Sequence, residues 1–182
     1  MAKDLVRIWV DAVRDAADAG EREIPGSEPL NQLQKALLRI LIQQDLCDCL
    51  SLSICSAEGI RDDASHAVWN KMYSELMEDA IAGLWSEEDY LEIERFMSLC
   101  SEGIGDTETY CAYFLRALGS EDESLRQVSD SIAVHVKKTA DRRLDAFIKA
   151  RKEQRDAKSP RRDDDPPPWL DEFEYIDWVM TH

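Results

Sequence analysis

Apolar residues recur at steps of three and four along almost the whole chain, and this periodicity constrains the fold more than any other feature of the sequence. In the segment from Lys3 to Ala19, for example, Leu5, Ile8 and Trp9 fall on one face of a helix. No stretch shows the alternation of Val, Ile and Thr that is typical of a strand. Hydrophobic residues make up 44% of the chain, which is enough for a packed core. The sequence therefore predicts an all-α, single-domain bundle of about six helices with a long C-terminal helix.

Glycine, proline and helix-capping residues divide this periodicity into six predicted helices. They cover about residues 3–19, 27–58, 63–84, 86–102, 106–118 and 121–158. The second has the widest apolar stripe and is expected to be the central core helix. The last would span on the order of 55 Å if it is unbroken. After Ile148 it is almost entirely charged, so its end is expected either to project into solvent or to meet a charged partner.

Charge is strongly separated along the 182 residues, whose formal net charge is -16. Residues 1–136 hold 11 basic and 27 acidic groups, residues 137–162 hold 11 basic and 4 acidic groups, and residues 163–182 hold 7 acidic groups and no basic one. Four cations of the basic block lie on the helix face opposite its apolar stripe and form a predicted basic patch. They are Lys138, Arg142, Lys149 and Lys152.

The C-terminal segment has a pattern of its own and is predicted to be a docking element. Residues 1–158 form the predicted bundle, residues 159–168 a stiff spacer rich in Pro and Asp, and residues 169–182 an amphipathic docking tail. On a helix, four apolar residues of this tail lie within about 60° of arc, with Leu170 beside them. These four, called the tail ridge below, are Trp169, Phe173, Ile176 and Met180.

Two surfaces are candidates to cover the tail ridge. One is this protein's own basic helix, where Leu144 and Phe147 would offer an apolar floor between the cations. The other is a groove on a partner protein, read through anchors at helical spacing. An isolated helix this short is marginal in water, so the tail is expected to fold against one of the two, and the remaining alternative is a tail that stays loose.

No combination of residues predicts catalysis, a metal or a cofactor, and the chain is expected not to be an enzyme. Glu-x-x-His pairs and a His-Glu-x-x-His motif, which mark carboxylate-bridged iron and zinc sites, are absent from the sequence. Cys47 and Cys49 would point about 200° apart on a helix and make a poor chelate. The five cysteines are read as reduced, mostly buried thiols, and His66 as a surface residue.

The resulting hypothesis is a non-enzymatic protein-interaction module, such as an adaptor, accessory subunit or inhibitor, that holds another protein through its tail and long helix. One alternative is an acidic nucleic-acid mimic that inhibits a nucleic-acid-binding enzyme. A second is a nucleic-acid-binding accessory protein that uses the basic half of the long helix. Eight cations would serve this second alternative: Lys137, Lys138, Arg142, Arg143, Lys149, Arg151, Lys152 and Arg155. The sequence predicts a cytoplasmic protein without a membrane partner and leaves its oligomeric state open.

Overall fold

The computed structural model describes residues 2–26, 30–101, 106–119 and 123–158, and these residues form helices joined by short connections. The helices are α1 (Ala2–Glu21), α2 (Gln32–Cys47), α3 (Leu50–Glu58), α4 (Asp62–Ala80), α5 (Glu87–Ser101), α6 (Thr107–Leu118) and α7 (Glu123–Lys158). The described part of the chain contains no strand, so the predicted all-α class is confirmed. The described residues form seven helices, and the prediction was of about six.

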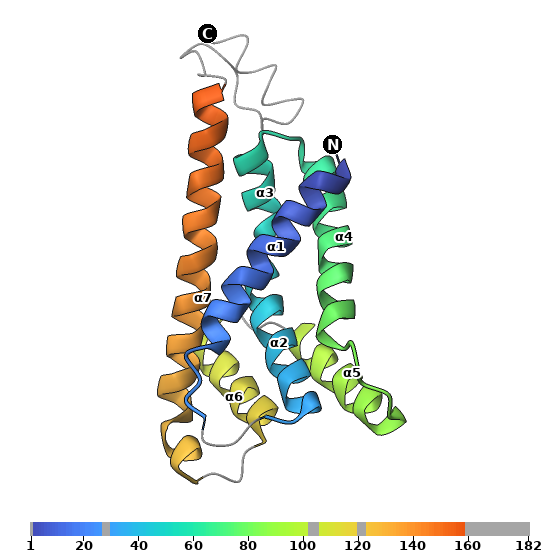
Figure 1. Cartoon of the computed structure of the whole chain (residues 1–182), viewed down its shortest axis with the longest axis vertical. Coiled ribbons are helices and arrows are strands. Elements are labelled where there is room, and N and C mark those ends of the chain that lie inside the picture. Colours follow the sequence, from blue (N-terminus) through green and yellow to red (C-terminus); the bar gives the residue numbers. More distant parts are fainter. Residues whose placement is uncertain (1, 27–29, 102–105, 120–122, 159–182) are drawn as a thin grey trace.

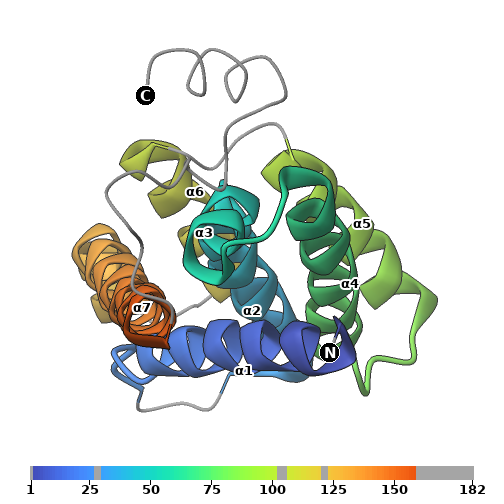
Figure 2. The same ribbon diagram turned by 90° about the horizontal axis from the view of Figure 1, so that it is seen from above.

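Helix α2 lies at the centre of the bundle, as predicted, and the other helices surround it (Figures 1 and 2). It packs against each of the other six. Its buried side chains face nearly every direction around the helix axis, and Leu38, Ile40, Leu41 and Ile42 are at most 1% exposed. A helix that is apolar on all sides can be stable only when it is covered on all sides, which explains this central position.

A break at Asp48 and Cys49 divides the predicted second helix into α2 and α3, so the expectation of one continuous helix was wrong. The two axes differ by 54°. Cys49 adopts the left-handed conformation with φ 55°, which no α-helix accommodates. The bend allows α2 to pack against α5 and α6 while α3 turns toward α4 and α7. Tertiary packing therefore overrides a sequence pattern that contains neither glycine nor proline at this point.

Side-chain caps fix where several helices begin, and most of them follow the sequence signals. Asp106 accepts a hydrogen bond from the backbone N–H of Thr109 at the start of α6. The Ser86 hydroxyl accepts one from the backbone N–H of Asp89 at the start of α5. Helix α2 begins later than predicted, because Asn31 forms a capping box with Gln34.

Helix α7 is 36 residues long and lies beside α1, α3 and α6 (Figure 1). Its approach to α1 is close at Gly20, where an added Cβ atom would lie 3.1 Å from the carbonyl oxygen of Val136 and 3.2 Å from the Cβ of Ala140. Further along, Phe147 packs edge-on against Trp9 of α1, with 5.2 Å between ring centroids. The predicted long C-terminal helix therefore packs along one side of the bundle.

Candidate interaction surface

The basic residues of α7 fall into two groups, and the first group binds the bundle itself. Lys137 bonds both carboxylate oxygens of Asp45 on α2 at 2.6 and 2.5 Å, in a place where the Asp45 side chain is 7% exposed. Arg143 donates to Asp15 of α1 at 2.5 Å. These contacts use the cations to attach α7 to acidic positions of the bundle.

The last turns of α7 are attached in the same way. Arg151 donates two hydrogen bonds to Glu58 of α3, at 2.9 and 2.6 Å, and Glu58 also accepts one from the indole of Trp9 at 3.0 Å. Arg155 donates to the backbone oxygen of Ser56. Of the two outcomes predicted for this charged end, the structure shows the meeting with a charged partner, and that partner is α3 of the same chain.

The second group is the predicted basic patch of Lys138, Arg142, Lys149 and Lys152, which the spacing places within about 80° of arc on α7. Lys138, Arg142 and Lys149 are exposed, and Lys152 is half-buried. Lys149 lies 4.0 Å from Glu153 of the same helix. The other three form no ion pair with any residue that the structure describes.

Two expectations about the basic helix can be compared with the structure. Leu144 is 5% exposed within the core, and Phe147 is half-buried and packs edge-on against Trp9. Four of the eight cations suggested for nucleic-acid binding contact other helices of this chain. They are Lys137, Arg143, Arg151 and Arg155.

The docking tail falls outside the residues that the structure describes, and so does the spacer before it. This applies to every predicted partner-binding residue of the tail. These residues are Trp169, Leu170, Phe173, Ile176 and Met180.

Sequence reasoning missed one exposed aromatic side chain, Trp85. It lies in the connection between α4 and α5 and is 89% exposed, directly after Leu84, which is 4% exposed. The hydroxyl of Tyr90 donates to the backbone oxygen of Leu84, so Tyr90, itself 43% exposed, lies close by. The available signal was that Trp85 stands outside every helical apolar stripe, directly before the Ser86 cap.

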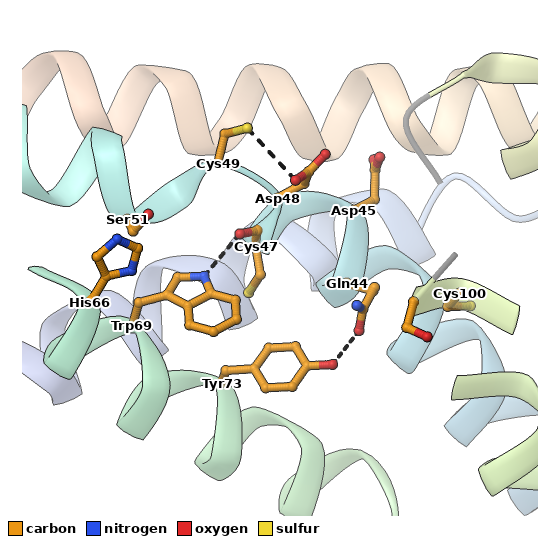
Figure 3. A pocket seen from close by; sticks show the side chains of 11 residues that line it. Gln44, Asp45, Cys47, Asp48, Cys49, Ser51, His66, Trp69, Tyr73 and Cys100 are labelled. Carbon is orange, nitrogen blue, oxygen red and sulfur yellow. Dashed lines mark hydrogen bonds between the residues drawn. The ribbon is translucent and has the colours of Figure 1, made fainter. Parts of the chain in front are cut away.

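A hollow of about 240 Å³ lies at the junction of α2 and α3 (Figure 3). His66, Trp69 and Tyr73 line it from α4, and Cys47, Asp48 and Cys49 line it at the α2–α3 break. The Trp69 indole donates to the backbone oxygen of Cys47 at 2.9 Å, and the Tyr73 hydroxyl donates to the side-chain oxygen of Gln44. The hollow is therefore lined by aromatic side chains whose polar ends are held by α2.

The cysteines are free thiols, and four of them are buried as predicted, while Cys49 is exposed. Burial raises the pKa of Cys47 and of Cys100, which both line the hollow, to about 12. These two groups are therefore protonated thiols at neutral pH and weak nucleophiles. Among the described residues, no group of three or more His, Cys, Asp or Glu side chains is arranged to hold a metal ion.

Comparison of this chain with protein-family models, curated proteins and solved structures finds no match. Within the described ranges, no single helix has both the length and the apolar character of a membrane span.

Proposed function

We propose that this chain is a non-enzymatic protein-interaction module that holds a partner protein through residues 169–182 and the basic patch of α7. The observation that carries the proposal is the division of the α7 cations. One group is attached to the bundle by close ion pairs, as in the contact of Lys137 with Asp45. Lys138, Arg142 and Lys152 have no ion pair with any described residue. The basic patch therefore takes no part in attaching α7 to the described bundle, and it faces outward, where carboxylates of another protein could reach it.

The chemistry of the tail supports a protein partner. The tail ridge combines two aromatic and two aliphatic anchors at helical spacing, and carboxylates flank it at Asp171, Glu172 and Glu174. Such a segment fits an apolar groove bordered by cations. The basic patch fits carboxylates on the same partner, and this opposite polarity fixes the orientation of the two proteins.

The positions of Leu144 and Phe147 favour a groove on another molecule. These were the two apolar side chains expected to receive the tail ridge on α7. Leu144 is buried in the core, and Phe147 is half-buried and packs against Trp9 of α1. The basic patch that remains is charged, with Asp145 among its cations. It can attract the acidic groups of the tail, but it offers little apolar surface to a tryptophan.

The experiment that tests the proposal compares two sides of the tail. Trp169→Ala with Phe173→Ala removes the two largest anchors of the tail ridge, while Trp178→Ala removes a tryptophan on the opposite side of the same predicted helix. Proteins are first co-purified with the natural chain from its native host. Those whose capture depends on the tail ridge are then purified and titrated against each variant. Buried aromatic anchors dominate interface energies, so we expect the double variant to weaken binding about 100-fold and Trp178→Ala to change it little.

A co-purifying protein that binds the double variant and the wild type equally would overturn the proposal, provided that circular dichroism shows an intact fold. Reversal of the patch with Lys138→Glu and Arg142→Glu is a second, independent arm. It is expected to slow association and to reduce its dependence on salt. Gel filtration with a polyanion and with a polycation distinguishes the proposal from the two nucleic-acid alternatives, because neither polymer should bind at moderate salt.

A further inference from the structure

The hollow at the α2–α3 junction has the properties of a ligand site separate from the tail and the basic patch. We propose that it binds an organic cation, namely the guanidinium or ammonium group of an amino-acid side chain or of a small amine. Its volume of about 240 Å³ is below the range of typical small-molecule pockets and fits a group of side-chain size.

The charges around the hollow favour a cation. Asp48 is exposed and forms no ion pair with any described residue, and it follows the last turn of α2, where the carbonyl end of the helix dipole is negative. Asp45 also lines the hollow, but Lys137 neutralises it from the far side. The described lining contains no lysine or arginine, and its His66 lies 3.6 Å from Asp62. A negative charge therefore remains on the wall of the hollow without a counter-charge.

The aromatic wall supplies the second attraction. The rings of Trp69 and Tyr73 are stacked, with centroids 5.1 Å apart and planes 13° from parallel. Their hydrogen bonds to Cys47 and Gln44 hold them against the end of α2 (Figure 3). Both rings are half-buried, and a cation is attracted to the face of such a ring. An ammonium or guanidinium in the hollow would meet these rings and would lie near the negative end of α2.

The backbone at the edge of the hollow is strained in a way that is typical of binding sites. Cys49 holds the left-handed conformation although it is not glycine, and this places Asp48 and Cys49 between the ends of α2 and α3. The thiol of Cys49 lies 3.7 Å from the carboxylate of Asp48, which is a weak interaction. Asp48 is thus a carboxylate residue of the hollow's lining without an ion pair to any described residue.

The test uses two ligands of nearly the same shape. N-acetylarginine amide carries the cation, and N-acetylcitrulline amide replaces it with a neutral urea. Binding is followed by the NMR resonance of the Trp69 indole N–H in the full chain, assigned with Trp69→Phe. We expect the arginine compound to shift this resonance in a saturable manner and the citrulline compound to leave it unchanged. Asp48→Asn should weaken arginine binding about tenfold, since it removes a charge-assisted contact. Glu75→Gln, which removes one charge from an exposed position of α4 outside the hollow, should not.

The source of the cation is distinguished by two further probes. Equal affinity for agmatine and for an arginine-containing tripeptide would assign the hollow to a small amine, and tighter binding of the tripeptide would assign it to a side chain of a partner protein. The proposal is overturned if millimolar N-acetylarginine amide leaves the Trp69 resonance in place. It is also overturned if the citrulline compound binds equally well, or if Asp48→Asn has no more effect than Glu75→Gln.

Discussion

At the scale of single residues, Cys49 combines an unfavourable backbone conformation with an exposed side chain. It is the one non-glycine residue with positive φ in the part of the chain that the structure describes. A left-handed conformation costs a residue with a Cβ atom about 1–2 kcal/mol. Glycine avoids this cost, but it gives up more backbone freedom on folding, which lowers stability by about 0.5–1 kcal/mol. We therefore expect Cys49→Gly to raise the free energy of unfolding by about 0.5–1 kcal/mol, measured by urea denaturation.

Cys49→Ala is the matched control for this prediction. It removes the thiol and keeps the Cβ atom, so it should leave the free energy of unfolding close to that of the wild type. If the glycine variant is no more stable than the alanine variant, the left-handed conformation is not a source of strain in this protein.

Gly20 shows the opposite case, in which glycine is required by space. It lies in the last turn of α1, and its missing Cβ atom leaves room for the carbonyl oxygen of Val136. Alanine is the better helix former by about 1 kcal/mol, but the added methyl group would push against backbone that cannot rotate away. We expect Gly20→Ala to lower the free energy of unfolding by about 1 kcal/mol and Gly20→Ser to lower it further. A stabilised alanine variant would show that α1 and α7 can separate at no cost.

At the scale of the elements, Glu58 joins three helices through two neighbouring contacts. It accepts hydrogen bonds from Trp9 of α1 and from Arg151 of α7, and its own side chain on α3 is 11% exposed. Replacement by glutamine would leave the guanidinium without its counter-charge, because a neutral amide cannot neutralise it. We expect Glu58→Gln to lower the free energy of unfolding by about 2–3 kcal/mol.

The ion pair of Lys149 with Glu153 is the control for this prediction on the same helix. Its two side chains are 80% and 68% exposed, so Glu153→Gln should change the free energy of unfolding by less than about 0.5 kcal/mol. In addition, Arg151→Met combined with Glu58→Gln should cost less than the two single changes together, because each single change leaves one partner unpaired. Additive losses would show that the pair does not couple α3 to α7.

Local signals allowed most elements to be predicted, while the break between α2 and α3 depends on distant contacts. The predicted helix starts near residues 86 and 106 depend on signals contained within four residues of sequence, and in the structure Ser86 and Asp106 cap the helices there. Nothing near Cys49 marks the end of a helix. The bend there lets α3 pack against α4 and α7, which are distant in the sequence. The periodicity of a single segment does not contain this information.

The candidate surface was predictable only in part for a similar reason. The spacing along α7 places Lys138 and Arg142 on one face, and the structure shows both to be exposed. The spacing does not show which acidic residue each cation meets, since Arg151 and Glu58 are 93 positions apart in the sequence. The hollow is formed by α2, α4 and α5 together and left no signal in any one of them.

At the scale of the whole molecule, one buried and two partly buried carboxyl groups influence how stability depends on pH. Burial raises the pKa of Glu21, of Asp45 and of Asp141, in each case against the opposing effect of a nearby cation. The folded chain therefore holds these protons more tightly than the unfolded chain does. The stability gained in this way is fully present below the unfolded pKa values, near pH 4, and is lost as the pH rises through the raised folded values.

We accordingly expect the free energy of unfolding to increase as the pH is lowered from 7 towards 5. Asp141→Asn should reduce this slope, because it removes one of the three groups. Asp106→Asn should not reduce the slope. Hydrogen bonds from Thr109 lower the pKa of Asp106, so the stability that Asp106 contributes is lost only in stronger acid. Repulsion within a chain of net charge -16 acts in the same direction, but 1 M NaCl shortens the screening length to about 3 Å and suppresses repulsion between surface charges. A slope that persists in 1 M NaCl and decreases with Asp141→Asn belongs to the buried carboxyl groups, whereas a slope that disappears in salt would assign the pH dependence to the surface.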